Sequence, residues 1–323
     1  MLKTKDLMER MGQISVIPND IIETEVKVIR LVEERGVAGT PYTKVINTIC
    51  KFVKDYCHTM PINTTRKINI PEEITQKIDF INKLNLVVTI HNTNKPYHLN
   101  NFGGGETQVD IDNVIVDNKI NEVFISIKCY SFCGILIEKT FYNSLYHEIN
   151  HCYDAYMDLK SNGYYHRFIK QGKKSNISIN IFNDYMLDNL FRIILYRLFC
   201  ETEFNALVSS VFGDLEGLHS KRENFKQDIN NTQAYYYYHL ISKNYKSLYK
   251  NINDENVKKI KQLFMEYGIH LNPYNNSTES FIKELSRKTN FLLKQLIKNI
   301  GRVASVYYDT KEVEIPKKKI TIK

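Results

Sequence analysis

The segment FYNSLYHEINHCYDAYM, residues 141–157, most constrains what this chain can fold into. It holds two histidines four residues apart, His147 and His151, and Glu148 follows directly after the first of them. Residues at this spacing share one face of an α-helix, with Cβ atoms about 5–6 Å apart. The spacing therefore predicts a helix that presents both imidazoles on the same side.

This arrangement has a specific chemical use. Two imidazoles on one helical face can both reach a single Zn²⁺ at about 2.0–2.1 Å. The residue after the first histidine is rotated by about 100° around the helix, so its carboxylate does not bind the metal but can reach a water bound to it. The H-E-x-x-H pattern thus predicts zinc bound by His147 and His151, with Glu148 as general base. The alternative is two surface histidines on an amphipathic helix.

A zinc site of this kind needs a third protein ligand. One known pattern places a glycine and a further histidine shortly downstream, and this chain has neither. Asp154 lies on the face of His147, where we expect it to support the site or face solvent rather than bind the metal. The later segment LFCETEFNAL offers Glu201 and Glu203 within an apolar run. Buried carboxylates are costly unless they are paired or bound to a metal.

We expect Glu201 to be the third ligand. Asn205 lies one helical turn after it on the same face, where its side chain can hydrogen-bond a ligand histidine and fix the tautomer. Glu203 is the alternative ligand. It lies about 200° around the helix from Glu201, so only one of the two carboxylates can face the metal.

HEINH followed by E-x-x-x-N resembles the gluzincin metallopeptidases, such as the thermolysin-like and membrane CAAX-type peptidases, in which HExxH is followed by E-x-x-x-D on a later helix. The resemblance covers residues 140–210 and, at the level of pattern, the sheet before them. It implies a zincin-like fold, hydrolysis of peptide bonds, Glu148 as base, and zinc ligation by His147, His151 and Glu201. Asn205 stands where the family has aspartate, which removes a negative charge beside the ligands.

The pattern along the chain predicts an α+β fold, with a small sheet followed by a mainly helical region. A helical pair occupies the first 60 residues, and a strand at 84–91 and a β-hairpin within 107–132 form the sheet. Four helices are expected after the motif helix: 183–213, 221–250, 254–267 and 277–300, the last with Asn276 and Glu279 as capping pair and Gly301 as stop. The expected regions are an N-terminal helical segment 1–65, a sheet region 66–135, a zinc-binding region 136–304 and a basic tail 305–323.

Composition narrows the classes of function. The chain has a net charge of +8, but its basic residues are scattered among acidic ones, and the one dense basic run, IPKKKITIK, is expected to be a solvated tail. We therefore do not expect nucleic-acid binding. The sequence has neither an apolar run long enough for a bilayer nor a signal peptide, which favours a cytoplasmic protein without a membrane partner. Six cysteines without a CxxC pair indicate buried, reduced thiols.

The expected partner is a peptide or protein substrate, which could add as a strand to an exposed sheet edge at residues 121–130. The reaction also needs a donor that stabilises the oxyanion. The candidates are Tyr164, Tyr165, His166 and His239. The competing class is a structural or interaction module with a zincin-like fold and no peptidase activity, for example in a phage or another large assembly.

Overall fold

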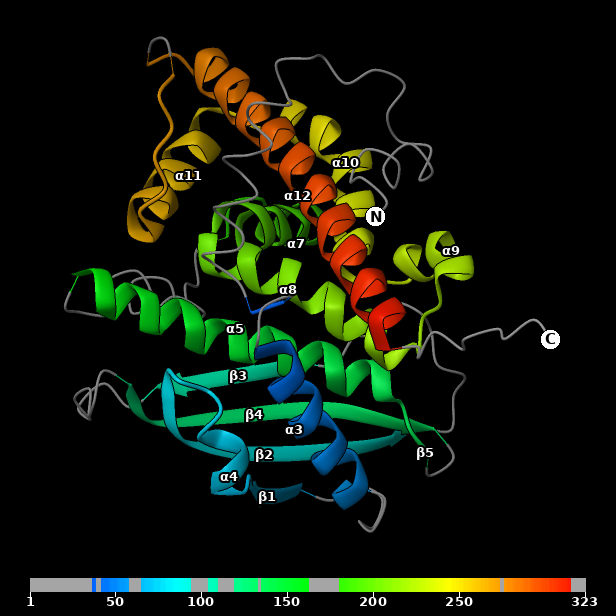
Figure 1. Cartoon of the computed structure of the whole chain (residues 1–323). Helices are drawn as coiled ribbons and strands as arrows, with labels where there is room; N and C mark the ends of the chain where they lie inside the picture. The colour runs from blue at the N-terminus through cyan, green and yellow to red at the C-terminus, as the bar shows by residue number, and fades with distance from the viewer. Residues whose placement is uncertain are drawn as a thin grey trace.

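The computed structural model describes residues 37–38, 42–57, 65–93, 104–109, 119–132, 135–162, 180–273 and 276–314. A small sheet lies at one end of the molecule, and helices build the remainder (Figure 1). The predicted α+β class is confirmed. The first helix of the expected N-terminal pair, the tail after residue 314, and Tyr164, Tyr165 and His166 lie outside the described residues.

The sheet contains five strands, with the order β1-β2-β4-β3 and β5 paired to β4. The strands are β1 Thr65–Asn69, β2 Ile81–Thr93, β3 Gly104–Val109, β4 Ile120–Phe132 and β5 Ile135–Leu136. The parallel pair β2 and β4 forms the centre, and β3 pairs antiparallel with β4 as the predicted hairpin. The predicted edge, residues 121–130, is wrong because β4 has a partner strand on each side. Within the described part of the chain, β3 is the edge strand on that side.

One face of the sheet is buried. On β2 and β4, alternate residues point into the core and pair across the strands, as Leu86 does with Ile125 and Val88 with Ile127. The residues between them face outward, and Phe124 is 37% exposed. The buried face explains the alternating pattern in the sequence, because only one side of each strand contacts the helices.

The motif helix α5, Glu138–Asn162, lies along β3 and β4, and α3, Tyr42–Cys57, lies beside it (Figure 1). The hydroxyl of Tyr146 donates to Asn47 Oδ1 at 2.8 Å, which ties the two helices together. The short helix α4, Glu72–Thr75, leads into β2. The thiols of Cys50, Cys129, Cys152 and Cys200 are buried and unbridged, as expected for reduced cysteines.

The segment predicted as one helix over 183–213 is interrupted. The helix α7, Tyr185–Ile194, runs into a π-helix, η1, Leu195–Phe199, and Cys200 is extended at φ −82° and ψ 111° before α8 begins. The helix α8, Glu201–Gly217, then packs antiparallel along α5. Near its end, a Cβ on Gly213 would lie 2.6 Å from the Tyr142 carbonyl oxygen and one on Gly217 2.5 Å from Lys139 Cα. Only glycine allows this approach of the two backbones.

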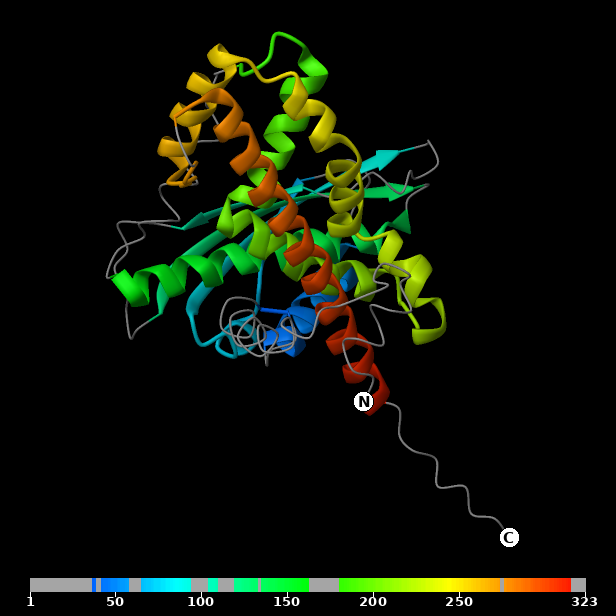
Figure 2. The ribbon, with the colours of Figure 1, turned by 90° about the horizontal axis from the view of Figure 1, so that it is seen from above.

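The remaining helices form a layer over α7 and α8 (Figure 2). They are η2 Arg222–Asn224, α9 Phe225–Asn230, α10 Gln233–Lys250, α11 Asp254–Tyr267 and α12 Thr278–Glu314. The bounds of α11 match the prediction, whereas the expected helix 221–250 is divided between α9 and α10. The helix α12 continues through Gly301, so that residue does not stop it, and the helix begins after Ser277, whose Oγ accepts from the Ser280 N–H. None of the helices in the described ranges has the length and apolar character needed to cross a bilayer.

Candidate metal centre

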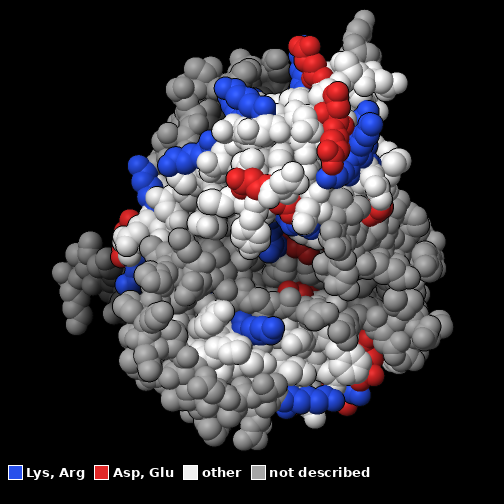
Figure 3. Space-filling view, turned by 180° about the vertical axis from the view of Figure 1, so that it is seen from behind, with Lys and Arg blue, Asp and Glu red and all other residues white. Residues whose placement is uncertain are grey.

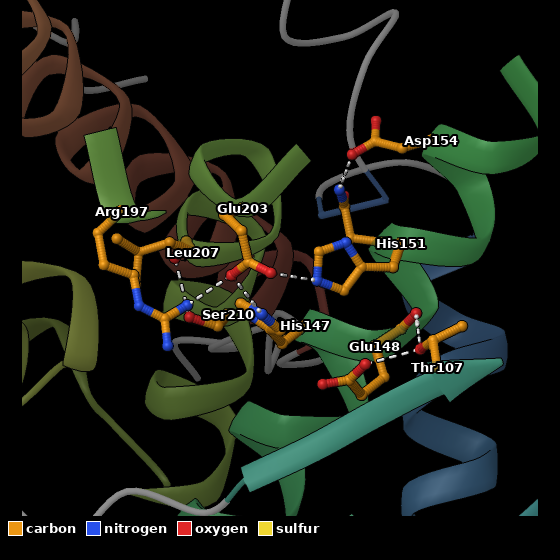
Figure 4. A network of polar contacts seen from close by, with 10 residues as sticks. Thr107, His147, Glu148, His151, Asp154, Arg197, Glu203, Leu207 and Ser210 are labelled. Atoms are coloured by element: carbon orange, nitrogen blue, oxygen red, sulfur yellow. Dashed lines mark hydrogen bonds and ion pairs between the residues drawn. The ribbon is translucent and has the colours of Figure 1, made fainter. Parts of the chain in front are cut away.

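His147 and His151 meet Glu203 between α5 and α8 (Figure 4). His147 Nε2 lies 3.5 Å from Glu203 Oε2, and His151 Nε2 lies 3.5 Å from Glu203 Oε1. All three ligand atoms lie within 4.8 Å of one another. The histidine side chains are 12% and 11% exposed and that of Glu203 is 30% exposed, so the group is largely enclosed but accessible from one side. These three residues are called the metal cluster below.

The metal cluster has the donor set and spacing that zinc needs. Ligand atoms about 2.0–2.1 Å from a tetrahedral Zn²⁺ lie about 3.3–3.4 Å apart, close to the observed nitrogen–oxygen separations. The Nδ1 atom of His147 is buried and has no hydrogen-bond partner among the described residues. That nitrogen is not the one that faces Glu203, so the donor set available to a cation is Nε2 of each imidazole together with the carboxylate.

The electrostatics of the metal cluster favour an ionised carboxylate. Burial of Glu203 favours its neutral form, but contacts with His147 and His151 hold the pKa of the carboxyl group well below its usual range. Burial lowers the pKa of His151, but the contact with Glu203 outweighs it, and the pKa is raised to about 9. Opposite charges on His151 and Glu203 thus favour their close approach, and a bound cation would replace the imidazolium proton.

Glu148 points toward the sheet and is not part of the metal cluster (Figure 4). Its Oε2 accepts a hydrogen bond of 2.6 Å from the hydroxyl of Thr107 on β3, and its side chain is buried. The charge of Glu148 contributes to the raised pKa of His151, so the carboxylate lies within electrostatic reach of the metal cluster. This placement agrees with the rotation expected for the residue after the first histidine.

Asn150 connects the motif helix to its surroundings. Its Oδ1 accepts from Ser209 Oγ on α8 at 2.6 Å and from the Val37 N–H at 3.2 Å. Its Nδ2 donates to Asp154 Oδ2 at 3.2 Å. Asp154 is therefore held beside Asn150, outside the metal cluster. The contact between Asn150 and Ser209 fixes α5 against α8 one residue before the second histidine.

Glu203, and not the expected Glu201, faces the two histidines. The two glutamates lie about 200° apart on α8, so Glu201 points away from the metal cluster. The break at Cys200 starts a new helix and sets which residues of α8 face α5. No hydrogen bond joins Asn205 to either histidine in the described part of the chain, so the supporting role expected for Asn205 stays a prediction.

Sequence reasoning missed Arg197, which lies on η1 beside the metal cluster (Figure 4). Its Nη1 donates to Glu203 Oε2 at 2.8 Å, and its guanidinium lies 5.1 Å from the ring centre of Tyr237. Burial lowers the pKa of Arg197, but the charge of Glu203 outweighs it and raises the pKa. No spacing rule links Arg197 to the HEINH motif. The only sequence signal was a cation within an apolar run, which needs a partner when buried.

Of the proposed oxyanion donors, only His239 lies in the described residues. It is exposed on α10, and its ring lies nearly parallel to that of Tyr235, with the two ring centres 6.5 Å apart. It is not part of the metal cluster. The space-filling view from behind shows a hollow between the sheet and the upper helices, with acidic atoms at its floor and Lys or Arg atoms beside them (Figure 3).

Comparison of the chain with protein-family models, curated proteins and solved structures finds no match. The geometry of the metal cluster and its neighbours is therefore the basis for the proposed function.

Proposed function

We propose that this chain is a zinc-dependent metallopeptidase in which His147, His151 and Glu203 hold the metal and Glu148 is the general base. The observation that carries the proposal is the convergence of three ligand atoms within 4.8 Å beside a glutamate that is not part of the cluster. Bound zinc would polarise a carbonyl and lower the pKa of its water toward 7. The H-E-x-x-H order then supplies a carboxylate on the next residue of the helix.

In this mechanism the proton transfers would depend on Glu148 and on its contact with Thr107. Thr107 holds the Glu148 carboxylate toward β3, so that its second oxygen remains available to accept a proton. The same carboxylate would return the proton to the departing amine. No described residue is assigned as oxyanion donor.

A peptide substrate could pair with β3. Within the described residues β3 pairs only with β4, so its outer side is a sheet edge there, and a sheet edge can pair with another strand. Because Thr107 on this strand contacts Glu148, a peptide added to that edge would pass beside the base. This replaces the edge expected at residues 121–130 and keeps the same mode of recognition.

The competing function is a structural or interaction module without peptidase activity. The ion pair between Arg197 and Glu203 favours it, because it gives the partly buried carboxylate a cationic partner within the protein. A structural module has no use for Glu148 as a base, however. The effect of changing Glu148 therefore separates the two functions.

The decisive experiment compares the wild type with Glu148→Gln after zinc loading. Glutamine preserves size and can still accept the hydrogen bond from Thr107, but it cannot take up a proton. We expect the variant to keep its zinc and its melting temperature, and to cleave casein or a peptide library at least ~100-fold more slowly. Equal cleavage by both proteins, or no cleavage by the zinc-loaded wild type, would favour the structural module.

A further inference from the structure

Arg197 reaches the metal cluster across an unusual stretch of backbone. It lies in the five-residue π-helix η1, and Cys200 is extended between η1 and α8. In an unbroken α-helix, residues six apart would lie about 120° apart around the axis and about 9 Å apart along it. Here the side chains of Arg197 and Glu203 meet at 2.8 Å. π-helical turns occur often at functional sites, and this one places the Arg197 guanidinium beside the Glu203 carboxylate.

The contact distinguishes the two oxygens of Glu203. Oε2 accepts from Arg197 Nη1 and lies 3.5 Å from His147 Nε2, whereas Oε1 lies 3.5 Å from His151 Nε2. The guanidinium is fixed from its other side by the ring of Tyr237, which limits how far it can swing away. One carboxylate oxygen therefore has the Arg197 guanidinium as well as His147 beside it, and the other faces His151.

We propose that Arg197 is a positioning residue that keeps Glu203 a one-oxygen metal ligand. This inference rests on the proposed metal site. A carboxylate that binds through both oxygens would occupy the coordination position that a catalytic zinc leaves open for water. By holding Oε2, Arg197 restricts Glu203 to Oε1 and so preserves that position.

The first test uses Co²⁺ in place of zinc, because its visible absorption bands report the number of ligands. We expect wild type and Arg197→Lys to share the strong bands of a four-coordinate site, since the lysine ammonium can still donate to Oε2 although it loses the planar contact with Tyr237. Arg197→Met removes the donor but keeps an unbranched chain. Its bands should weaken at least roughly two-fold as Glu203 adds its second oxygen. Identical spectra for wild type and Arg197→Met would overturn the proposal.

The second test needs no variant and decides the question if Arg197→Met does not fold. A crystal structure of the zinc-loaded wild type should place Glu203 Oε1 about 2.0–2.2 Å from the metal, with Oε2 still on Arg197. Two Glu203 oxygens on the metal would overturn the role of Arg197 and leave the metallopeptidase intact. A wild type that takes up neither Zn²⁺ nor Co²⁺ would instead remove the proposed function, and this inference with it.

Discussion

Two polar clusters lie between the same two helices, and they differ in how they are closed. The first, the sealed cluster, consists of Lys139 on α5 and Asp214 on α8, which are 3% and 0% exposed. Asp214 Oδ2 accepts from the Gln233 N–H at 2.7 Å, and Lys139 Nζ donates to the Asn231 carbonyl oxygen. The second is the metal cluster, whose glutamate is 30% exposed.

The difference follows from the small residues near the end of α8. Gly213 and Gly217 bring its backbone against that of α5, which closes this end of the helix pair around the sealed cluster. At the other end the two helices meet through longer side chains, His147, His151 and Glu203. The same helix pair thus buries two charged side chains at one end and presents an accessible donor set at the other. Charged side chains lie between the helices in both clusters. Only the metal cluster has a carboxylate exposed enough for a ligand to reach it.

The largest expected effect concerns the metal cluster and its third ligand. Zinc at 1,000 times its dissociation constant should stabilise the wild type by about 4 kcal/mol. Glu203→Gln should lose most of this stabilisation, because it removes the anionic ligand. The matched control is Glu201→Gln, which should retain it. Thermal melts with zinc and with a chelator measure the difference, and a larger loss in the control would restore Glu201 as the ligand.

The next effect concerns the glycines beside the sealed cluster. Gly217→Ala should lower the free energy of unfolding by about 3 kcal/mol, since overpacking against a backbone outweighs the gain in helix propensity. Its added Cβ would meet Lys139 Cα at 2.5 Å, and backbone cannot move aside as a side chain can. Gly213→Ala should behave in the same way. Denaturant unfolding measures both, and a variant more stable than the wild type would show that the helices are less close than described.

The smallest expected effect is a pH dependence in the sealed cluster. Burial raises the pKa of Asp214 to about 6, although Lys139 opposes the shift. The folded state therefore binds this proton more tightly than the unfolded chain does. Stability from Asp214 should rise as pH falls from about 6 to 4, by about 1 kcal/mol per pH unit.

Asp214→Asn isolates this contribution from other titrating groups. The variant cannot ionise, yet its amide oxygen can still accept from the Gln233 N–H. Unfolding at several pH values should show it gaining stability relative to the wild type as pH rises from 4 to 6. Parallel profiles for the two proteins would mean that Asp214 titrates as an ordinary surface carboxylate.

Much of the fold could be predicted because it follows local patterns. The alternation on β2 and β4 and the bounds of α11 follow from hydrophobic periodicity, and the motif helix follows from the spacing of His147 and His151. The strand order could not be predicted, because the position of β3 beside β4 depends on long-range pairing. Periodicity alone therefore does not identify the sheet edge.

The metal cluster could be predicted in its histidines and not in its carboxylate. HEINH fixes two donors on one helix, whatever the rest of the chain does. Which of Glu201 and Glu203 faces the histidines depends on the break at Cys200. The apolar run LYRLFCETEF contains no helix-breaking residue that would predict this break. Arg197 depends on the same break. Local sequence thus predicts a site within one helix better than contacts made across an irregular turn.

The close approach at Gly213 is also a point about which a tilt of α8 would move the residues at its other end. From there back to Glu203, α8 extends over ten residues, about 15 Å at 1.5 Å per residue. A tilt of α8 by only about 4° around the glycine contact would move Glu203 by about 1 Å, several times the roughly 0.2 Å tolerance of a metal–ligand distance. The packing of Gly213 and Gly217 against α5, far from the metal cluster, therefore affects the distance between Glu203 and the two histidines.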